Sequence, residues 1–133
     1  MEVFCLQDKT ISVVLGLNDN NMKELFSNSA CYILASTIFH NYGFPCKQAY
    51  VVFEDGEVLE IHAFNEDTSG VCYDINGRKS LPEMIEYIKT YINPEEKYQI
   101  LFRDLEAIDK QRLSTNFSRL YKVALSISQA IIA

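Results

Sequence analysis

The sequence predicts an α+β fold in which a central helix packs on an antiparallel sheet, with flanking helices at the C-terminus. Three observations support this prediction. A helix pattern that is apolar nearly all round begins at Cys31, and short runs rich in β-branched and aromatic residues follow it, separated by turn residues. An amphipathic pattern of helical period then fills the end of the chain. Because 133 residues can bury a sizeable core without a metal or disulfide, we expect one domain over residues 1–133.

The composition is that of a globular protein. Apolar residues make up 48% of the chain, with eight Phe and eight Tyr, which is too apolar for a disordered chain. The sequence has no run of about 18 apolar residues, so we expect no membrane-spanning helix. Glu2 and Asp8 lie near the start, where a signal peptide would have a basic region followed by an apolar one. We therefore expect a cytoplasmic protein.

The charge and the cysteines argue against several classes of site. A net charge of −6 is the wrong sign for a phosphate-binding surface, so no direct nucleic-acid binding is expected. The sequence has no glycine-rich phosphate loop and no Cys-x-x-Cys pair, and His40 and His62 are its only histidines. We expect no cofactor and no metal. Cys5 and Cys72 lie in apolar strand patterns and are expected to be small buried residues.

Two strands are predicted first, over residues 1–6 and 10–15. Asn21 and Glu24 form a capping-box pattern for a short helix that runs through Phe26. Ser29 is then the predicted N-cap of a second helix over residues 30–41, which Gly43 and Pro45 end.

This second helix is expected to be central, and Cys31 lies in its first turn. Backbone N–H groups and the helix dipole favour a thiolate there. His40 lies about 180° around the helix from Cys31 at ~100° per residue, so it is expected to be partly exposed and unable to serve the thiol. Cys31 also has a simpler interpretation, as a small buried residue. One face of the helix carries Cys31, Leu34, Ala35, Ile38 and Tyr42.

Strands over residues 49–53 and 58–64 flank an Asp-Gly hairpin turn. In the second strand, Leu59, Ile61 and Ala63 share one face, and His62 lies on the other. His62 could be structural, functional or a surface residue. A third strand is predicted over residues 71–74. If residues 66–70 form the loop, Asn65 faces Val71, and Asp74 lies directly opposite His62. Asp74 could instead simply begin a turn.

The remaining elements are a helix, a strand and further helices. Ser80 and Glu83 form a second capping box, and a strand that could lie at a sheet edge is predicted over residues 98–102. The chain is expected to turn helical from Arg103 onwards. The last helix has an apolar stripe that we expect to be core, although its small residues and apolar end would also allow a homo-oligomer interface. The stripe consists of Phe117, Leu120, Tyr121, Ala124, Ile127 and Ile131.

A resemblance rests on four short motifs in the order Ser29-Ala30-Cys31-Tyr32, Tyr42-Gly43-Phe44-Pro45, His62 and Tyr73-Asp74-Ile75-Asn76-Gly77. The first motif resembles the cysteine motif of papain-like proteases. The continuation is similar to transglutaminase-like members of that superfamily, including small phage and toxin-associated proteins and arylamine N-acetyltransferases. The resemblance covers about fifty residues. It implies a papain-like fold, Cys31 as nucleophile, His62 as general base and acid, and Asp74 orienting the imidazole.

The chain also departs from this family. Papain relatives carry an oxyanion-hole glutamine six residues before the cysteine, where this chain has Leu25, and the transglutaminase tryptophan is missing. Backbone N–H groups near Cys31 could replace the glutamine. Asn28 is the nearest side-chain candidate, although a weak one.

Three functions follow as hypotheses. The first is a thiol-dependent acyl-transfer enzyme or protease acting on a protein or peptide substrate. The second is a non-catalytic protein-binding protein, such as a phage-encoded inhibitor or an immunity protein, on a degenerate papain-like scaffold. The third is a homo-oligomeric assembly protein that uses the last helix.

Overall fold

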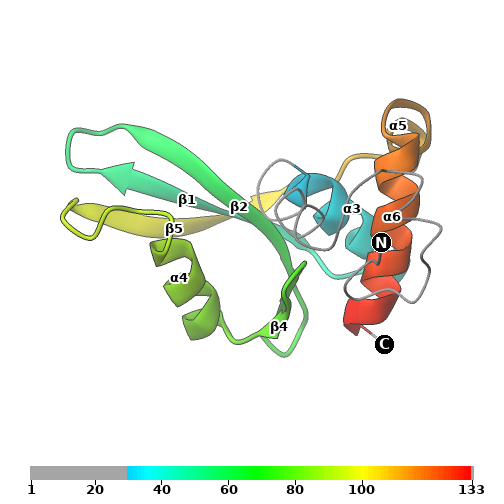
Figure 1. The fold of residues 1–133 in the computed structure, drawn as a ribbon, viewed down its shortest axis with the longest axis horizontal. Helices are drawn as coiled ribbons and strands as arrows, with labels where there is room; N and C mark the ends of the chain where they lie inside the picture. The colour runs from blue at the N-terminus through cyan, green and yellow to red at the C-terminus, as the bar shows by residue number, and fades with distance from the viewer. Residues whose placement is uncertain (1–29, 133) are drawn as a thin grey trace, which may run out of the picture.

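The computed structural model describes residues 30–132, in which the first helix and the last two are grouped on one side of a sheet and the second helix lies apart from them (Figure 1). The predicted strands over residues 1–6 and 10–15, the short helix through Phe26 and the residues Asn28 and Ser29 lie outside this range. Within it, the α+β prediction is confirmed. The elements in chain order are α3 (Cys31–Tyr42), β1 (Cys46–Phe53), β2 (Val58–Glu66), β3 (Cys72–Asp74), β4 (Gly77–Lys79), α4 (Leu81–Lys89), β5 (Tyr98–Leu105), α5 (Lys110–Asn116) and α6 (Ser118–Ile132).

The five strands of the described chain form one antiparallel sheet in the order β4-β3-β2-β1-β5. The Asp-Gly hairpin between β1 and β2 is confirmed. Gly56 adopts φ +88° in its turn, a backbone conformation that glycine reaches without steric cost. β5 lies at the edge of the sheet, as the sequence allowed.

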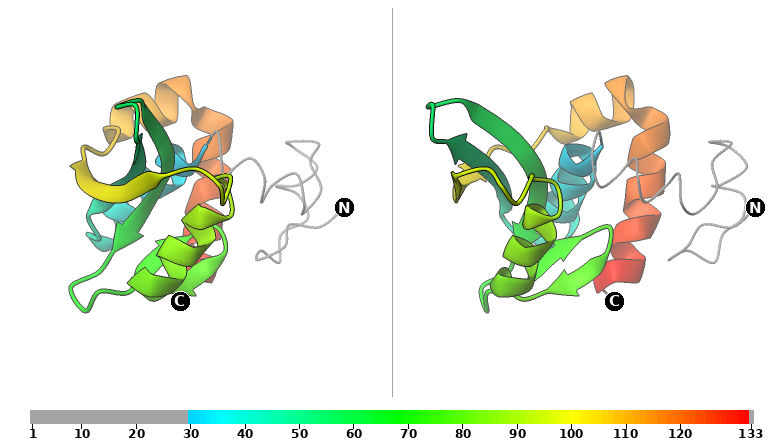
Figure 2. Two further views of the ribbon diagram at one scale, coloured as in Figure 1. Left: turned by 90° about the vertical axis from the view of Figure 1, so that its left-hand side faces the viewer. Right: turned by 60° about the vertical axis from the view of Figure 1, so that its left-hand side comes forward.

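Opposite faces of the sheet are covered by different helices. Phe64 and Cys72 face α4 and pack with Met84 and Ile88. Ala63 and the neighbouring strand residue Tyr73 face the other way, because side chains alternate along a strand. On that face α3 lies between the sheet and α6 (Figure 2). The prediction of a central helix is therefore confirmed.

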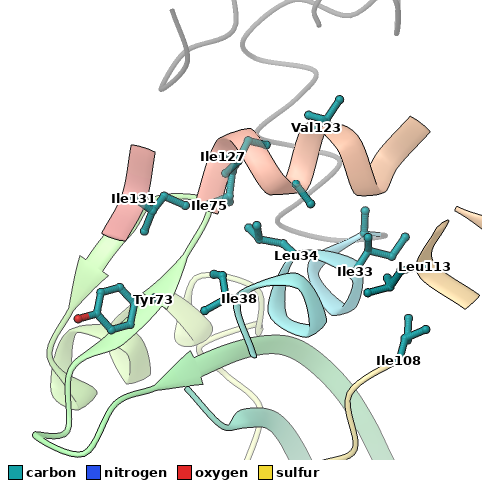
Figure 3. Packing of buried hydrophobic residues seen from close by; sticks show 12 residues of the cluster. Ile33, Leu34, Ile38, Tyr73, Ile75, Ile108, Leu113, Val123, Ile127 and Ile131 are labelled. Carbon is teal, nitrogen blue, oxygen red and sulfur yellow. The ribbon is translucent and has the colours of Figure 1, made fainter. Parts of the chain in front are cut away.

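The largest cluster of buried side chains joins α3 to α6 (Figure 3). In this cluster Leu34 of α3 lies toward Ile127 of α6, while Ile33 lies on the side of Leu113 and Ile38 on the side of Tyr73. The apolar stripe of the last helix is thus core. Whether the helix also binds a second copy stays a prediction. No helix in the described range is long and apolar enough to cross a bilayer.

The ends of α3 agree in part with the sequence. Gly43 ends the helix in the left-handed conformation at φ 75°, and its N–H donates to the carbonyl of Phe39. The N-cap position is Ala30, without a side-chain cap bond, rather than the predicted Ser29.

The capping box of α4 is confirmed, because Ser80 and Glu83 each accept a hydrogen bond from the other's backbone N–H.

One prediction about the C-terminal half is wrong. The helix predicted from Arg103 does not start there, since Arg103 pairs with Gln48 of β1 and extends β5 to Leu105. The next helix, α5, begins only at Lys110 after the Asp109 cap.

Candidate active site

Cys31 lies in the first turn of α3, against the edge of β2. Its side chain is nearly buried, with 9% of the residue exposed. The sulfur accepts a hydrogen bond from the backbone N–H of Ala63 at 3.4 Å and another from the N–H of Tyr32. β3 pairs with β2 only at Asn65 and Glu66. The backbone N–H of Ala63 lies outside this pairing and is therefore able to donate to the sulfur.

His62 is buried on β2, with only 2% of the residue exposed. It lies on the sheet face opposite Ala63, as the alternation predicted, and α4 covers that face. Its ring stacks on Phe64 at a centroid distance of 6.2 Å, and the edge-to-face contact with Tyr87 is 5.4 Å. The ring also makes two hydrogen bonds, one between Nε2 and Oδ2 of Asp74 at 3.0 Å and one with the Cys31 thiol. The ring therefore contacts both the carboxylate and the thiol.

Asp74 reaches His62 by a register that differs from the prediction. Asn65 pairs with Tyr73 instead of Val71, which places Asp74 across from Phe64 and diagonal to His62. Diagonal neighbours on one face of a strand pair are still within side-chain reach. The predicted direct opposition was therefore wrong, although the predicted contact is present.

The surroundings of Asp74 keep its carboxylate ionised. It is 3% exposed, and its Oδ1 accepts the backbone N–H of Asn76 at 2.9 Å. The Lys79 ammonium lies 3.2 Å from Oδ2 and 3.4 Å from Oδ1. Burial raises the pKa of the Asp74 carboxyl, but the hydrogen bond and charge of His62, with Lys79 and the Asn76 N–H, outweigh burial and lower the pKa overall.

Cys31 and His62 shift each other's pKa in the directions that favour an ion pair. Burial raises the pKa of Cys31, but the hydrogen bond and positive charge of His62, with the N–H groups of Ala63 and Tyr32, leave the pKa below its ordinary value. Burial lowers the pKa of His62, but Asp74 and Cys31 together raise it to about 9. The arrangement thus favours the pair of thiolate and imidazolium over the two neutral side chains.

The other two described cysteines have raised rather than lowered pKa values. Cys46 donates a hydrogen bond to the carbonyl of Ala35 at 3.2 Å, and burial raises its pKa to about 12. Cys72 is fully buried, as predicted, and burial raises its pKa to about 11. Among the described cysteines, only Cys31 combines a neighbouring imidazole with a lowered pKa.

Lys79, Tyr87 and Tyr91 belong to the site but were missed in the sequence. Lys79 Nζ lies 4.1 Å from the ring centroid of Tyr87, and the hydroxyls of Tyr87 and Tyr91 are 2.6 Å apart. Burial, the Tyr87 hydrogen bond and the charges of Asp74 and Cys31 raise the pKa of Tyr91. Lys79 could have been found from a tight turn at Ile75 and Asn76, because the pairing of Asp74 with Gly77 places Lys79 across from Cys72 and diagonal to Asp74.

The remaining candidates lie elsewhere. His40 is partly exposed, and its Nε2 contacts the carbonyl of Ile108 at 2.7 Å, away from Cys31 as predicted. Asn28, the weak oxyanion candidate, is outside the described residues. Within residues 30–132, no group of three His, Cys, Asp or Glu side chains is arranged to hold a metal ion.

Comparisons of the chain with protein-family models, curated proteins and solved structures found no match. The resemblance to papain-like and transglutaminase-like proteins therefore stays a prediction from the residues.

Proposed function

We propose that the protein is a thiol-dependent acyl-transfer enzyme or protease with Cys31, His62 and Asp74 as its catalytic residues. The observation that carries the proposal is the chain of contacts from the Cys31 sulfur through the His62 ring to Asp74 Oδ2, 3.0 Å from Nε2. An activated nucleophile requires a base within hydrogen-bond reach and a third group that orients the base. The contacts among the three side chains are those that such roles require.

The reaction would proceed in two redox-neutral steps. The Cys31 thiolate attacks a carbonyl carbon and forms a C–S bond, while an electron pair moves onto the oxygen. When the carbonyl re-forms, the bond to the leaving nitrogen or oxygen breaks, and the His62 imidazolium protonates the leaving group. In the second step His62 takes a proton from water or an amine, which attacks the thioester and releases the thiolate.

The backbone around Cys31 supports this role for the sulfur. The N–H groups of Ala63 and Tyr32 stabilise the anion before attack. A thiolate in a helix's first turn also benefits from the positive end of the helix dipole.

Alkylation followed by mass spectrometry tests the proposal. The full chain is treated with iodoacetamide between about pH 4 and pH 9, and each cysteine is quantified separately. Cys31 should react roughly tenfold or more faster than a small free thiol near pH 6, because the lowered pKa leaves a larger fraction of it as thiolate. His62→Gln should abolish this advantage, while Cys46 and Cys72 should stay unreactive in both proteins.

A second measurement tests acyl transfer itself. p-Nitrophenyl acetate should acetylate wild-type Cys31, and the adduct should disappear from Cys31→Ala. In His62→Gln any adduct should form slowly and persist, since no base activates water. A Cys31 thiol that is no more reactive than a free thiol and gains no acetyl group would refute the enzyme.

The small exposure of Cys31 favours a second candidate, a non-catalytic binding protein in which the three residues stabilise the fold. With 9% of Cys31 and less of His62 and Asp74 exposed, the described residues offer substrate little of the site. The acidic net charge would suit a basic protein partner. In that case Cys31→Ala would keep partner affinity and biological activity. A variant that keeps its fold and affinity but loses activity would count against this candidate.

A further inference from the structure

Asp74 has two cationic neighbours at one oxygen. His62 Nε2 lies 3.0 Å and Lys79 Nζ 3.2 Å from the same Oδ2, so the two nitrogens are no more than about 6 Å apart. The Lys79 side chain is only 14% exposed, which limits the screening of its charge by water. A carboxylate that oriented the imidazole alone would need no such second partner.

Packing holds Lys79 in this position. Its ammonium lies 4.1 Å from the centroid of the Tyr87 ring, a cation–π distance, and the edge of the same ring contacts His62. Lys79 itself comes from β4, where it pairs with Cys72 two residues from Asp74. Two neighbouring elements, β4 and α4, therefore fix the ammonium beside the carboxylate.

We propose that Lys79 is a positioning residue that shares Asp74 with His62 and limits how firmly the carboxylate retains the proton of the ring. This inference rests on the proposed function, because Lys79 matters to the reaction at the step in which His62 gives its proton to the leaving group. A buried, unshared carboxylate would stabilise the imidazolium so strongly that His62 would be a poor acid toward the leaving group. Lys79 offsets part of that attraction and keeps Asp74 ionised.

Several other ionisable groups surround Asp74, His62 and Lys79. Cys31 contacts His62 from α3, and Tyr87 and Tyr91 lie on α4. Glu83 and Cys72 also interact electrostatically with Lys79. None of them replaces the ammonium at Oδ2 in the described structure, since the contacts of that atom are those with His62 and Lys79.

Titration of His62 by NMR tests the inference without any substrate. The proteins compared are Cys31→Ala, which removes the thiol charge, and the same protein with Lys79→Gln or Lys79→Arg. Loss of the positive charge in Lys79→Gln should raise the pKa of His62 by about one unit, because a repelling charge at this distance is removed. Lys79→Arg keeps the charge and should change the pKa by less than about 0.3 unit.

Two outcomes would overturn the inference. Either Lys79→Gln leaves the His62 pKa within about 0.3 unit of the reference, or Lys79→Arg shifts it as far as Lys79→Gln does. If Lys79→Gln unfolds, Lys79→Met in the same background provides the second neutral variant. The result is independent of thiol reactivity: an unreactive Cys31 with a shifted His62 would refute the enzyme alone, and a reactive Cys31 with an unshifted His62 would refute the role of Lys79 alone.

Discussion

Replacing Asp74 by Asn removes the negative charge of the site and changes little else in shape. Asp74 is buried, and both His62 and Lys79 depend on its charge. Removing one partner of a buried ion pair typically costs about 3–5 kcal/mol. His62 can release its proton in response, so we expect about 3 kcal/mol lower stability near pH 6, with a smaller loss near pH 9.

The same variant should weaken the thiolate. The attraction between the Asp74 carboxylate and the His62 imidazolium sets the size of the effect. As a guide, two unit charges 4 Å apart interact by about 4 kcal/mol at an effective dielectric constant near 20, which is equivalent to about three pK units. The amide that replaces the carboxylate in this variant can still form part of its hydrogen bonds. We therefore expect Cys31 of Asp74→Asn to react with iodoacetamide at least about tenfold more slowly near pH 6.

Urea unfolding followed by circular dichroism measures the first effect, and alkylation the second. Asp104→Asn is the matched control, because Asp104 pairs with Lys47 but its side chain is 87% exposed. Such exposed pairs contribute about 0–1 kcal/mol. An Asp74→Asn protein that is destabilised no more than Asp104→Asn, with an unchanged alkylation profile, would refute the charge-coupled site.

Two further predictions concern pH and helix capping. In wild type the proton that folded His62 retains is offset by the proton that Cys31 gives up on folding, so the pair should add less pH dependence to unfolding than His62 would alone. In Cys31→Ala the folded His62, with its pKa raised above the unfolded value, binds a proton that the unfolded chain lacks. Stability should then fall as pH rises above about 6.5, by up to about 1.4 kcal/mol per unit, and a flat urea-unfolding profile would contradict this. Ser80→Ala removes the side-chain acceptor of the α4 cap and should cost about 1 kcal/mol in urea unfolding, whereas Ser114→Ala, outside any cap, should cost less.

Local sequence signals predicted the parts of the fold that local chemistry determines. The Asp-Gly turn before Glu57, the Ser80 cap and the left-handed Gly43 each depend on residues within one turn. The register of β3 does not. Asn65 is buried, and its side-chain N–H group donates to the carbonyls of Ala35 at 2.8 Å and Phe44 at 3.0 Å. These contacts with α3 and its exit, which fix the end of β2, are not visible in the loop sequence.

The site was predicted to a similar extent. The spacing of Cys31, His62 and Asp74 was sufficient to bring them together as hypotheses, but not to find Lys79, because β4 consists of only three residues and lacks an apolar pattern. Arg103 was predicted to begin a helix. Its place in β5 is instead stabilised by Gln48 and Glu60, which its guanidinium contacts at 2.6 Å each. Partners so distant in sequence override weak local preferences.

The short pairing between β2 and β3 means that Cys31 and Asp74 are held by different elements. Cys31 is anchored by α3, whereas Asp74 moves with a small hairpin joined to β2 through Asn65 and Glu66 alone. Arg78 of that hairpin donates to the carbonyl of Ile132 at the far end of the chain, 2.9 Å away. The last turn of α6 is therefore tied by a hydrogen bond to the hairpin that carries the carboxylate.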